Sequence, residues 1–294
     1  MAHPQRSLGT WRHDYNDRRP RGALHRNTML ESPHLAGIHL YPIKSLDGVT
    51  VPDCRVGPGG GLELDRAWAL YSEDGRLING KSTAAIHSIR AVFTSDVSSV
   101  TLSAADDRRD VAPKMFWFPG DCAAAGEWFS RFLERPVVVR YAVEGLPDDT
   151  DRNGPTVIST ATLQAVAGWF PGMDLEEARR RFRTSLEIGG VPAFWEDRLF
   201  GVHEQDAVRF TVGDVNIAGT NPCPRCPVPA RGSSSGVDMI GFQKRFTKLR
   251  GTHYPSWACQ PDGIDSFYHL AINTRVAPTE RGKVLRVGDP VSLR

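Results

Sequence analysis

Two cysteines three residues apart mark the part of the sequence that is best suited to chemistry. Cys223 and Cys226 lie in the run GTNPCPRCPVP, residues 219–229. A thiolate is both the nucleophilic and the metal-binding form of cysteine, and a neighbouring cation such as Arg225 favours it. Because prolines restrict the backbone and remove amide donors, we expect this run to be a rigid loop rather than a helix or a central strand.

Several kinds of site are compatible with this cysteine pair. A structural zinc site needs four ligands, usually from two such pairs, and the sequence has no second pair: Cys54, Cys122 and Cys259 are isolated. A thioredoxin-type redox pair lies where a strand enters a helix, whereas residues 230–236 (ARGSSSG) predict a loop here. The remaining interpretations are one cysteine ligand to a metal carried by an organic cofactor, and two half-buried thiols with a structural role.

Composition excludes several classes of protein. The 294 residues carry a formal net charge of +2, and 40% of them are hydrophobic, which allows a sizeable core in two modest domains or one large β-rich domain. We expect no nucleic-acid partner, because the charge is nearly balanced, and no membrane partner, because no apolar run is long enough to span a bilayer.

The five cysteines lack the spacing of a disulfide framework, which favours a reducing cytoplasm. Residues 1–34 are polar and predict a disordered tail without a secretory signal.

Short extended segments dominate the rest of the chain. Strands are expected at residues 38–41, 49–51, 66–71, 76–78, 91–94, 100–102, 137–143, 157–158, 186–188, 207–212, 215–218, 267–274 and 284–293. Helices are expected at residues 123–133, after a cap at Ser159, at residues 174–182 with Asp174 as cap, and at residues 239–249. This mostly antiparallel pattern predicts barrels. A shift in composition near residues 146–149 predicts a domain boundary.

Five segments in the same order resemble the MOSC family with a MOSC N-terminal β-barrel domain, and within it the molybdenum-dependent amidoxime-reducing components. They are LYPIKS (40–45), LDRAW (64–68), RFRTS (181–185), the cysteine run and VGDPV (287–291). The resemblance extends over nearly all of residues 36–294. It implies a mainly β fold with some α structure, in which residues 35–147 form the small barrel-like N-terminal domain and residues 148–294 form a MOSC β-barrel domain.

The same resemblance implies a molybdenum cofactor (Mo-molybdopterin), whose pterin carries a phosphate. Cys226 matches the cysteine that ligates molybdenum in the similar reductases, which makes it both the expected metal ligand and the expected catalytic residue. A soft thiolate suits a metal that is already bound by sulfur. Cys223 would support the loop or touch the pterin, and a purely structural role is equally compatible with its position. Pyridoxal phosphate is not expected.

The resemblance also implies a phosphate site at Lys44, Ser45 and Arg66. An ammonium, a hydroxyl and a planar guanidinium are suited to bind phosphate oxygens. Taken by itself, Lys44 is consistent with an ordinary exposed lysine in a turn. Arg66 lies in the expected apolar strand, where an unpaired buried charge would be costly. It therefore needs an anionic partner, which is either the phosphate or an acid such as Asp65.

Four further residues are candidates for cofactor contacts. Arg183 resembles an arginine that approaches the cofactor in the family, but it also fits the charged face of the helix before it. Ser159 and Thr160 stand where a helix begins, which is a natural anion site, or they only cap that helix. Asn221 offers amide donors and an acceptor to a pterin, and asparagine before proline is also a common loop residue.

The loop after Cys226 departs from the similar reductases. Residues 228–236 (VPARGSSSG) lack their acidic residues and contain a basic one, and residues 79–83 (NGKST) lack the usual arginine. The chain also shows no four-cysteine cluster pattern before Arg294. A reductase of this kind would therefore receive electrons from a separate iron–sulfur, haem or flavin protein.

The main hypothesis is a molybdenum-dependent oxidoreductase that reduces N-hydroxylated or N-oxide small molecules and releases water, with the protein supplying thiolate, phosphate cradle and pocket. A second hypothesis is a sulfur carrier that bears a persulfide on Cys226 and serves metal–sulfur cofactor assembly. A third is a binding module with a degenerate site and no turnover. The substitution C226S should remove metal in the first case, labile sulfur in the second and neither in the third.

Overall fold

The computed structural model describes residues 32–105, 111–142, 154–203, 205–263 and 266–294. Contacts group residues 31–294 into one unit and residues 1–30 into another, and only the first unit is described below. The predicted tail therefore lies almost entirely outside the described residues. The prediction of a mainly β protein with some helices is confirmed. None of the described helices combines the length and apolar character that crossing a bilayer requires.

The largest sheet has eight strands in the order β16-β12-β13-β14-β10-β11-β1-β2. All neighbours are antiparallel except β10 and β11, which are parallel. The strands are β1 (His34–Leu40), β2 (Val49–Val51), β10 (Val157–Ser159), β11 (Leu186–Gly189), β12 (Val208–Val212), β13 (Val215–Pro224), β14 (His269–Val276) and β16 (Val291–Leu293). The sheet thus combines strands from both sides of the predicted domain boundary. That boundary falls at residues outside the described ranges, and the division into two domains stays a prediction.

The end strand β16 approaches β1, which lies next to the opposite end strand β2. The amide of Leu35 donates to Asp289 O at 2.8 Å, and the amide of Val291 donates to Pro33 O at 2.9 Å. Among the described residues these contacts form a bridge at His34 and Pro290 rather than a pair of strands. Strand pairing therefore does not close the predicted barrel there. The buried side chains beneath the sheet include Leu35, Ile38, Phe210 and Ile272.

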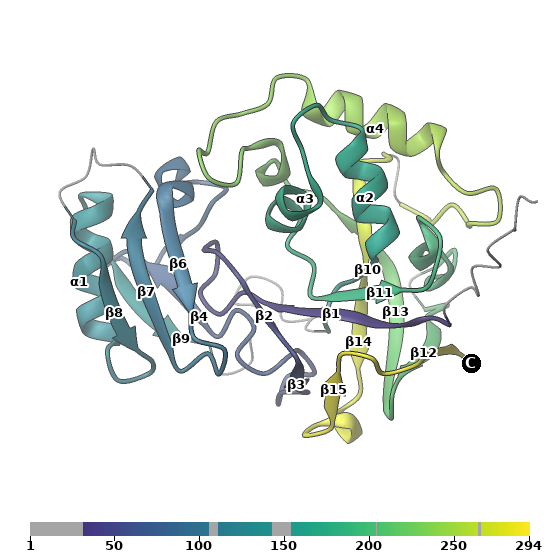
Figure 1. Cartoon of the computed structure of the whole chain (residues 1–294), viewed down its shortest axis with the longest axis horizontal. Coiled ribbons are helices and arrows are strands. Elements are labelled where there is room, and N and C mark those ends of the chain that lie inside the picture. The colour runs from purple at the N-terminus through teal and green to yellow at the C-terminus, as the bar shows by residue number, and fades with distance from the viewer. Residues whose placement is uncertain (1–31, 106–110, 143–153, 204, 264–265) are drawn as a thin grey trace, which may run out of the picture. The chain divides into compact units, whose positions relative to one another are not determined.

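Smaller sheets and one helix form a second core. The sheets of this second core are β4 (Trp68–Tyr71) with β5 (Leu77–Ile78) and β9 (Val138–Tyr141), and β6 (Ile89–Phe93) with β7 (Ser99–Ala104) and β8 (Lys114–Trp117). A two-stranded sheet of β3 (Asp53–Arg55) and β15 (Val284–Arg286) instead contributes Cys54 and Leu285 to the core of the large sheet. Helix α1 (Cys122–Leu133) lies beside β8 and β9 (Figure 1). Its residues Trp128, Phe129 and Phe132 are all buried on one face, as the helical spacing predicted.

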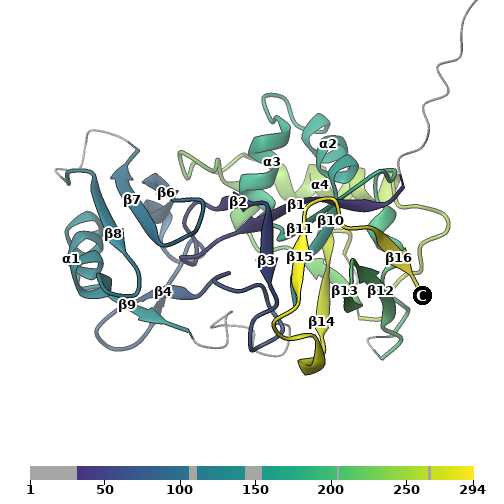
Figure 2. The same cartoon turned by 60° about the horizontal axis from the view of Figure 1, so that its bottom comes forward.

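Three helices cover one side of the large sheet (Figures 1 and 2). They are α2 (Thr160–Gly168), α3 (Leu175–Phe182) and α4 (Phe242–Thr252), with short 3₁₀ turns η1 (Ala84–Ser88), η3 (Trp195–Arg198), η4 (Val228–Ala230) and η5 (Pro278–Glu280) elsewhere. Both predicted caps are present: the Ser159 hydroxyl accepts from the Thr162 amide at 3.1 Å, and Asp174 accepts from the Glu177 amide at 2.7 Å. These bonds satisfy amide groups that a helix start leaves without a partner.

The prediction of a loop was wrong for the first half of the cysteine run. Strand β13 continues to Pro224, and Pro222 is paired with Ile272 of β14. The pairing with β12 ends at Gly219, and the register to β14 shifts twice beyond that point. Prolines are tolerated at such bulges and free strand edges because no ladder bond needs their missing amide hydrogen. The loop begins only at Arg225.

Candidate functional site

A cavity of about 590 Å³ contains most of the predicted site residues on its wall. It lies between the turn after β1, the segment around Gly80, the end of α3 and the cysteine run. Six of the nine candidates line it, namely Lys44, Ser45, Arg66, Arg183, Cys223 and Cys226. These residues come from distant parts of the chain, so the structure brings together what the sequence had only suggested separately.

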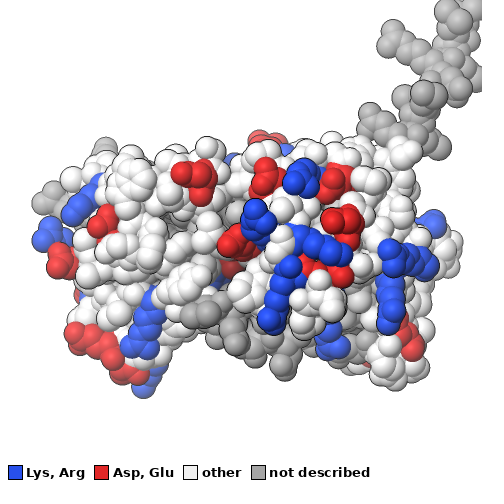
Figure 3. Space-filling model, turned by 90° about the horizontal axis from the view of Figure 1, so that it is seen from below, with Lys and Arg blue, Asp and Glu red and all other residues white. Residues whose placement is uncertain are grey.

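Positive charge is concentrated in this cavity. Its lining contains ten Lys or Arg residues and four Asp or Glu residues, whereas the whole chain has 36 of the former and 34 of the latter. The outer surface shown in Figure 3, by contrast, intersperses the two signs. A cleft with one dominant sign of charge attracts ligands of the opposite sign. The cavity is therefore suited to an anionic ligand.

Two guanidinium groups lie over the ring of Tyr41. The Cζ atoms of Arg183 and Arg66 are 4.1 Å and 4.7 Å from its centroid. Arg66 precedes β4 in a left-handed turn with φ +53°, so its predicted place inside the strand was wrong. It pairs with Asp65 and donates to Ser185 Oγ at 3.1 Å. Asp65 thus supplies the anionic partner that the sequence required.

Arg183 ends helix α3 and turns into the cavity. Its left-handed backbone, with φ +51°, caps the helix through a 2.8 Å bond from its amide to Arg179 O. Nη1 donates to Leu46 O, while Nη2 is buried and has no hydrogen-bond partner among the described residues. Burial lowers the pKa of Arg183 to about 10, opposed by Tyr41 and reinforced by Arg66. The group still carries its proton at neutral pH, so it presents an unsatisfied charged donor.

Lys44 and Ser45 are fixed by bonds to two neighbouring segments. The Lys44 amide donates to Trp68 O at 2.8 Å, which ties the turn to β4. Ser45 has a left-handed backbone with φ +73°, and its hydroxyl accepts from the Gly80 amide at 3.0 Å. The turn is therefore held in place before any ligand binds.

Both cysteines of the run line the cavity as free thiols. Arg225 donates from Nη1 to the sulfur of Cys223 at 3.5 Å and from Nη2 to Phe182 O at 2.9 Å. The cation that was expected to favour a thiolate thus contacts Cys223. The backbone of Cys226 is held through its carbonyl, which accepts from the Tyr268 hydroxyl at 3.3 Å. No three His, Cys, Asp or Glu side chains gather into a metal site in the described ranges.

Three candidates do not line the cavity. Ser159 is fully buried, and its hydroxyl caps α2. The Thr160 hydroxyl donates to Glu187 at 3.2 Å. Asn221 lies one residue behind the wall, because its Oδ1 accepts at 3.3 Å from Nδ2 of Asn273, which does line the cavity.

Sequence reasoning missed a buried carboxylate behind the wall. Glu187 accepts from Arg179 at 2.6 Å and 2.8 Å and lies 3.3 Å from His39 Nε2. Burial would raise the pKa of Glu187, but the bonds from Arg179 and His39 outweigh it and lower the pKa to about 2. The signal in the sequence was a charged residue inside an apolar strand, which needs a partner if it is buried.

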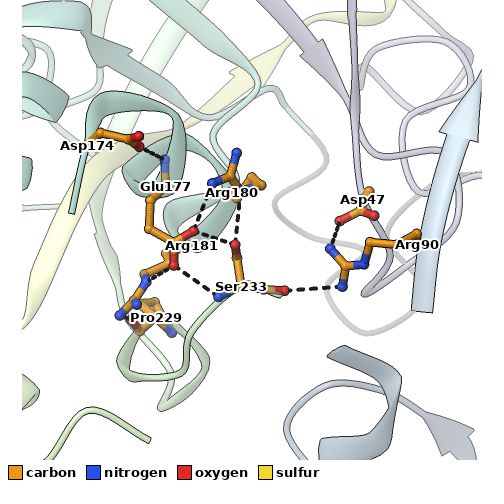
Figure 4. A network of polar contacts seen from close by, with 8 residues as sticks. All are labelled: Asp47, Arg90, Asp174, Glu177, Arg180, Arg181, Pro229 and Ser233. Atoms are coloured by element: carbon orange, nitrogen blue, oxygen red, sulfur yellow. Dashed lines mark hydrogen bonds and ion pairs between the residues drawn. The ribbon is translucent and has the colours of Figure 1, made fainter. Parts of the chain in front are cut away.

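A second missed carboxylate holds the loop after the cysteines, and Figure 4 shows its contacts. Glu177 accepts from Arg181 Nε at 2.6 Å, from Arg180 Nη2 at 3.0 Å and from the Ser233 amide at 3.0 Å. The Ser233 carbonyl accepts from Arg90 at 3.4 Å. Burial opposes the shift, but the bonds from Ser233 and Arg181 lower the pKa of Glu177 to about 2. We call these five residues the Glu177 network.

The fold and the cavity define a mainly β protein with a cation-lined, thiol-bearing site. Residues 32–136 match the family model of the MOSC N-terminal beta barrel domain. The chain is also similar to "Mitochondrial amidoxime reducing component 2" of Bos taurus, with 24% identity over 288 residues that cover 86% of this chain and 80% of that protein. The two findings together support the identification of this chain as a MOSC family protein. The family predicted from the five sequence segments is thereby confirmed.

Proposed function

We propose that this protein is a molybdenum-cofactor-dependent reductase of N-hydroxylated or N-oxide small molecules. The observation that carries the proposal is the cavity itself: Arg183 Nη2 is buried there without a partner among the described residues, and two free thiols line the same wall. A buried donor without a partner is costly, and an anionic oxygen would satisfy it. Similarity to a protein that is named for amidoxime reduction supports the type of reaction.

The residues of the cavity wall fit a phosphate-bearing, sulfur-rich cofactor. Arg183, Arg66, Lys44 and Ser45 would bind its phosphate, and the Cys226 thiolate would be the protein ligand to the metal. A guanidinium gives phosphate two parallel donors, and thiolate is the ligand type that such a metal prefers. Cys223 would contact the pterin or support the loop, and Asn221 would act through Asn273.

Ser159 and Thr160 are left out of this proposal. Their hydroxyls are already bonded inside the protein, and neither residue reaches the cavity wall. A helix start can bind an anion only where its amides face a ligand. We therefore assign these two residues to the fold.

The chain's own contribution to the reaction is to bind, orient and shield. When bound, the cofactor would supply the two-electron redox chemistry. The overall reaction consumes two electrons and two protons, breaks the N–O bond and releases water. The stacking of Arg66 and Arg183 on Tyr41 holds both cations in place in advance, which reduces the entropy lost on binding.

The electrons would come from a separate iron–sulfur, haem or flavin protein. The substrate would be a small molecule that enters the same cavity. The relative from Bos taurus is named as mitochondrial, and the cytoplasmic location that we expect from the cysteine content stays a prediction.

The test is the molybdenum and pterin content of protein made in a host that synthesises the cofactor. We expect close to one molybdenum per native chain, a complete loss in C226S and retention in C122S, which is the matched control because Cys122 is a free cysteine outside the cavity wall. Reduction of benzamidoxime with an artificial electron donor should follow the metal content. Native protein without molybdenum and pterin would refute the proposal.

A sulfur carrier with a Cys226 persulfide is the second candidate. A persulfide is an anion, and the cationic lining of the cavity would stabilise it. This function predicts cyanide-labile sulfur on the native protein and its loss in C226S, with no bound pterin. The same purified samples therefore distinguish the two candidates.

A further inference from the structure

The cations on the cavity wall differ in how their charge is balanced. Several of them pair with shielded acids: Arg66 with Asp65, Arg179 with Glu187 and Arg181 with Glu177. Such pairs add little net charge to the cavity. Around Gly80, by contrast, two cations have no buried acid as partner in the part of the chain that the structure describes.

These two cations are Arg231 and Lys81. Arg231 lines the cavity, donates from Nη1 to Gly80 O and from Nε to Asp238 at 3.2 Å, and the Asp238 side chain is 72% exposed. An ion pair with so exposed an acid contributes little. Lys81 follows Gly80, also lines the cavity, and has no ion pair within the described residues.

The position of Arg231 is built into the fold. Its loop is held on one side by the Glu177 network through Ser233. On the other side it packs on η1, where a Cβ added to Gly236 would lie 3.2 Å from Ala84 O. The Met239 amide closes the loop by donating to Ala230 O at 2.8 Å. Arg231 is thus a fixed part of the wall, and a fixed cation binds an anion with less loss of entropy.

Arg231 and Arg183 both affect the pKa of His87. The imidazole of His87 lies 3.3 Å from Gly80 O through Nε2. Burial lowers the pKa of His87, the bond to Gly80 O opposes this shift, and Arg231, Arg183 and Arg90 lower the pKa further. Arg231 and Lys81 thus share one cavity with the proposed phosphate site, but they come from different segments of its wall.

We propose that Arg231 and Lys81 form a second anion-binding subsite that receives an anionic group of the substrate. The substrate class would be N-hydroxylated or N-oxide compounds that carry a carboxylate or a similar group. This inference rests on the proposed function, because it takes the phosphate of the cofactor to occupy the Arg183 site. Arg231 is also the single charged residue among residues 228–236, the loop that departs from the similar reductases.

The first test compares benzamidoxime with 4-carboxybenzamidoxime on the molybdenum-loaded protein. We expect 4-carboxybenzamidoxime to have the higher kcat/KM. R231M and K81M should each lower the ratio of its kcat/KM to that of benzamidoxime about tenfold, which is the effect of losing one charge-assisted hydrogen bond. R231K should retain part of the preference. K244M is the matched control, because Lys244 is an exposed lysine of α4 outside the cavity wall. A ratio that R231M and K81M leave unchanged would overturn the proposal.

The second test measures binding without turnover. Calorimetry with 4-carboxybenzamide should give a lower Kd than with benzamide, and K81M should remove the difference. Equal affinities would overturn the subsite. If the loaded protein reduces neither amidoxime but still prefers 4-carboxybenzamide, the proposed function fails while the anion subsite stands. The cofactor released from the denatured protein could instead carry a second phosphate, and R231M could lose the cofactor. Both results together would assign Arg231 and Lys81 to the cofactor and overturn the substrate subsite.

Discussion

Substitution of Glu177 tests how much the Glu177 network contributes to the free energy of unfolding. The substitution Glu177→Gln preserves size but removes the negative charge that Arg180, Arg181 and Ser233 surround. A pKa that falls from 4.5 to about 2 on folding corresponds to roughly 3 kcal/mol at neutral pH. Because the Arg180 side chain is 47% exposed and solvent screens that pair, we expect E177Q to lower the free energy of unfolding by about 2 kcal/mol.

The pH dependence follows from the same shift. The pKa of Glu177 is lower in the folded protein, so the folded state favours the carboxylate, and this contribution is present above pH 4.5. It is lost as the pH falls toward 2. The difference between native protein and E177Q should therefore be largest at pH 7 and smaller by more than half at pH 3.

Urea unfolding at pH 7 and pH 3, followed by circular dichroism, measures both values. The control is E176Q, because Glu176 is 62% exposed and its loss should change the free energy of unfolding by less than about 0.5 kcal/mol. If E177Q and E176Q destabilise the protein equally at pH 7, or if the effect of E177Q does not shrink on acidification, the electrostatic reasoning is refuted.

Three further predictions test other parts of the structure. R250M should lower the free energy of unfolding by about 3–5 kcal/mol in urea titrations, because it leaves the buried carboxylate of Asp197 without its ion pair; a loss below about 1 kcal/mol would contradict this. R183M should lower the pterin and molybdenum content of purified protein, and unchanged content would remove Arg183 from the proposed phosphate site. S159A should cost about 1 kcal/mol of stability through the lost cap of α2 and leave the molybdenum content unchanged, whereas loss of the metal would restore Ser159 as a cofactor residue.

Local features were predictable because they depend on near neighbours in the chain. The buried face of α1 follows from the spacing of Trp128, Phe129 and Phe132. The caps at Ser159 and Asp174 follow from side chains that bond amides three residues ahead. The family, and with it a list of candidate site residues, followed from five short segments.

Two of the local predictions that failed did so because contacts with other residues overrode the local preference. The prolines of the cysteine run predicted a loop, but pairing with β14 extends β13 to Pro224 while the other edge stays open. The apolar run after Arg66 predicted a strand from that residue. The bonds of Arg66 to Asp65 and Ser185 instead accompany a left-handed turn, and β4 begins at Trp68.

The sequence by itself determined the main elements, the reactive thiols, the phosphate-suited cations and the family. Only the tertiary structure decided which of them share a cavity: Arg183 and Cys226 do, whereas Ser159 does not. It also decided that Arg225 contacts Cys223, since that contact depends on how the run packs against the end of α3. The physical reason is that long-range pairing, such as that of β1 with β11 and β13 with β14, places these segments side by side, and no local pattern encodes such distances.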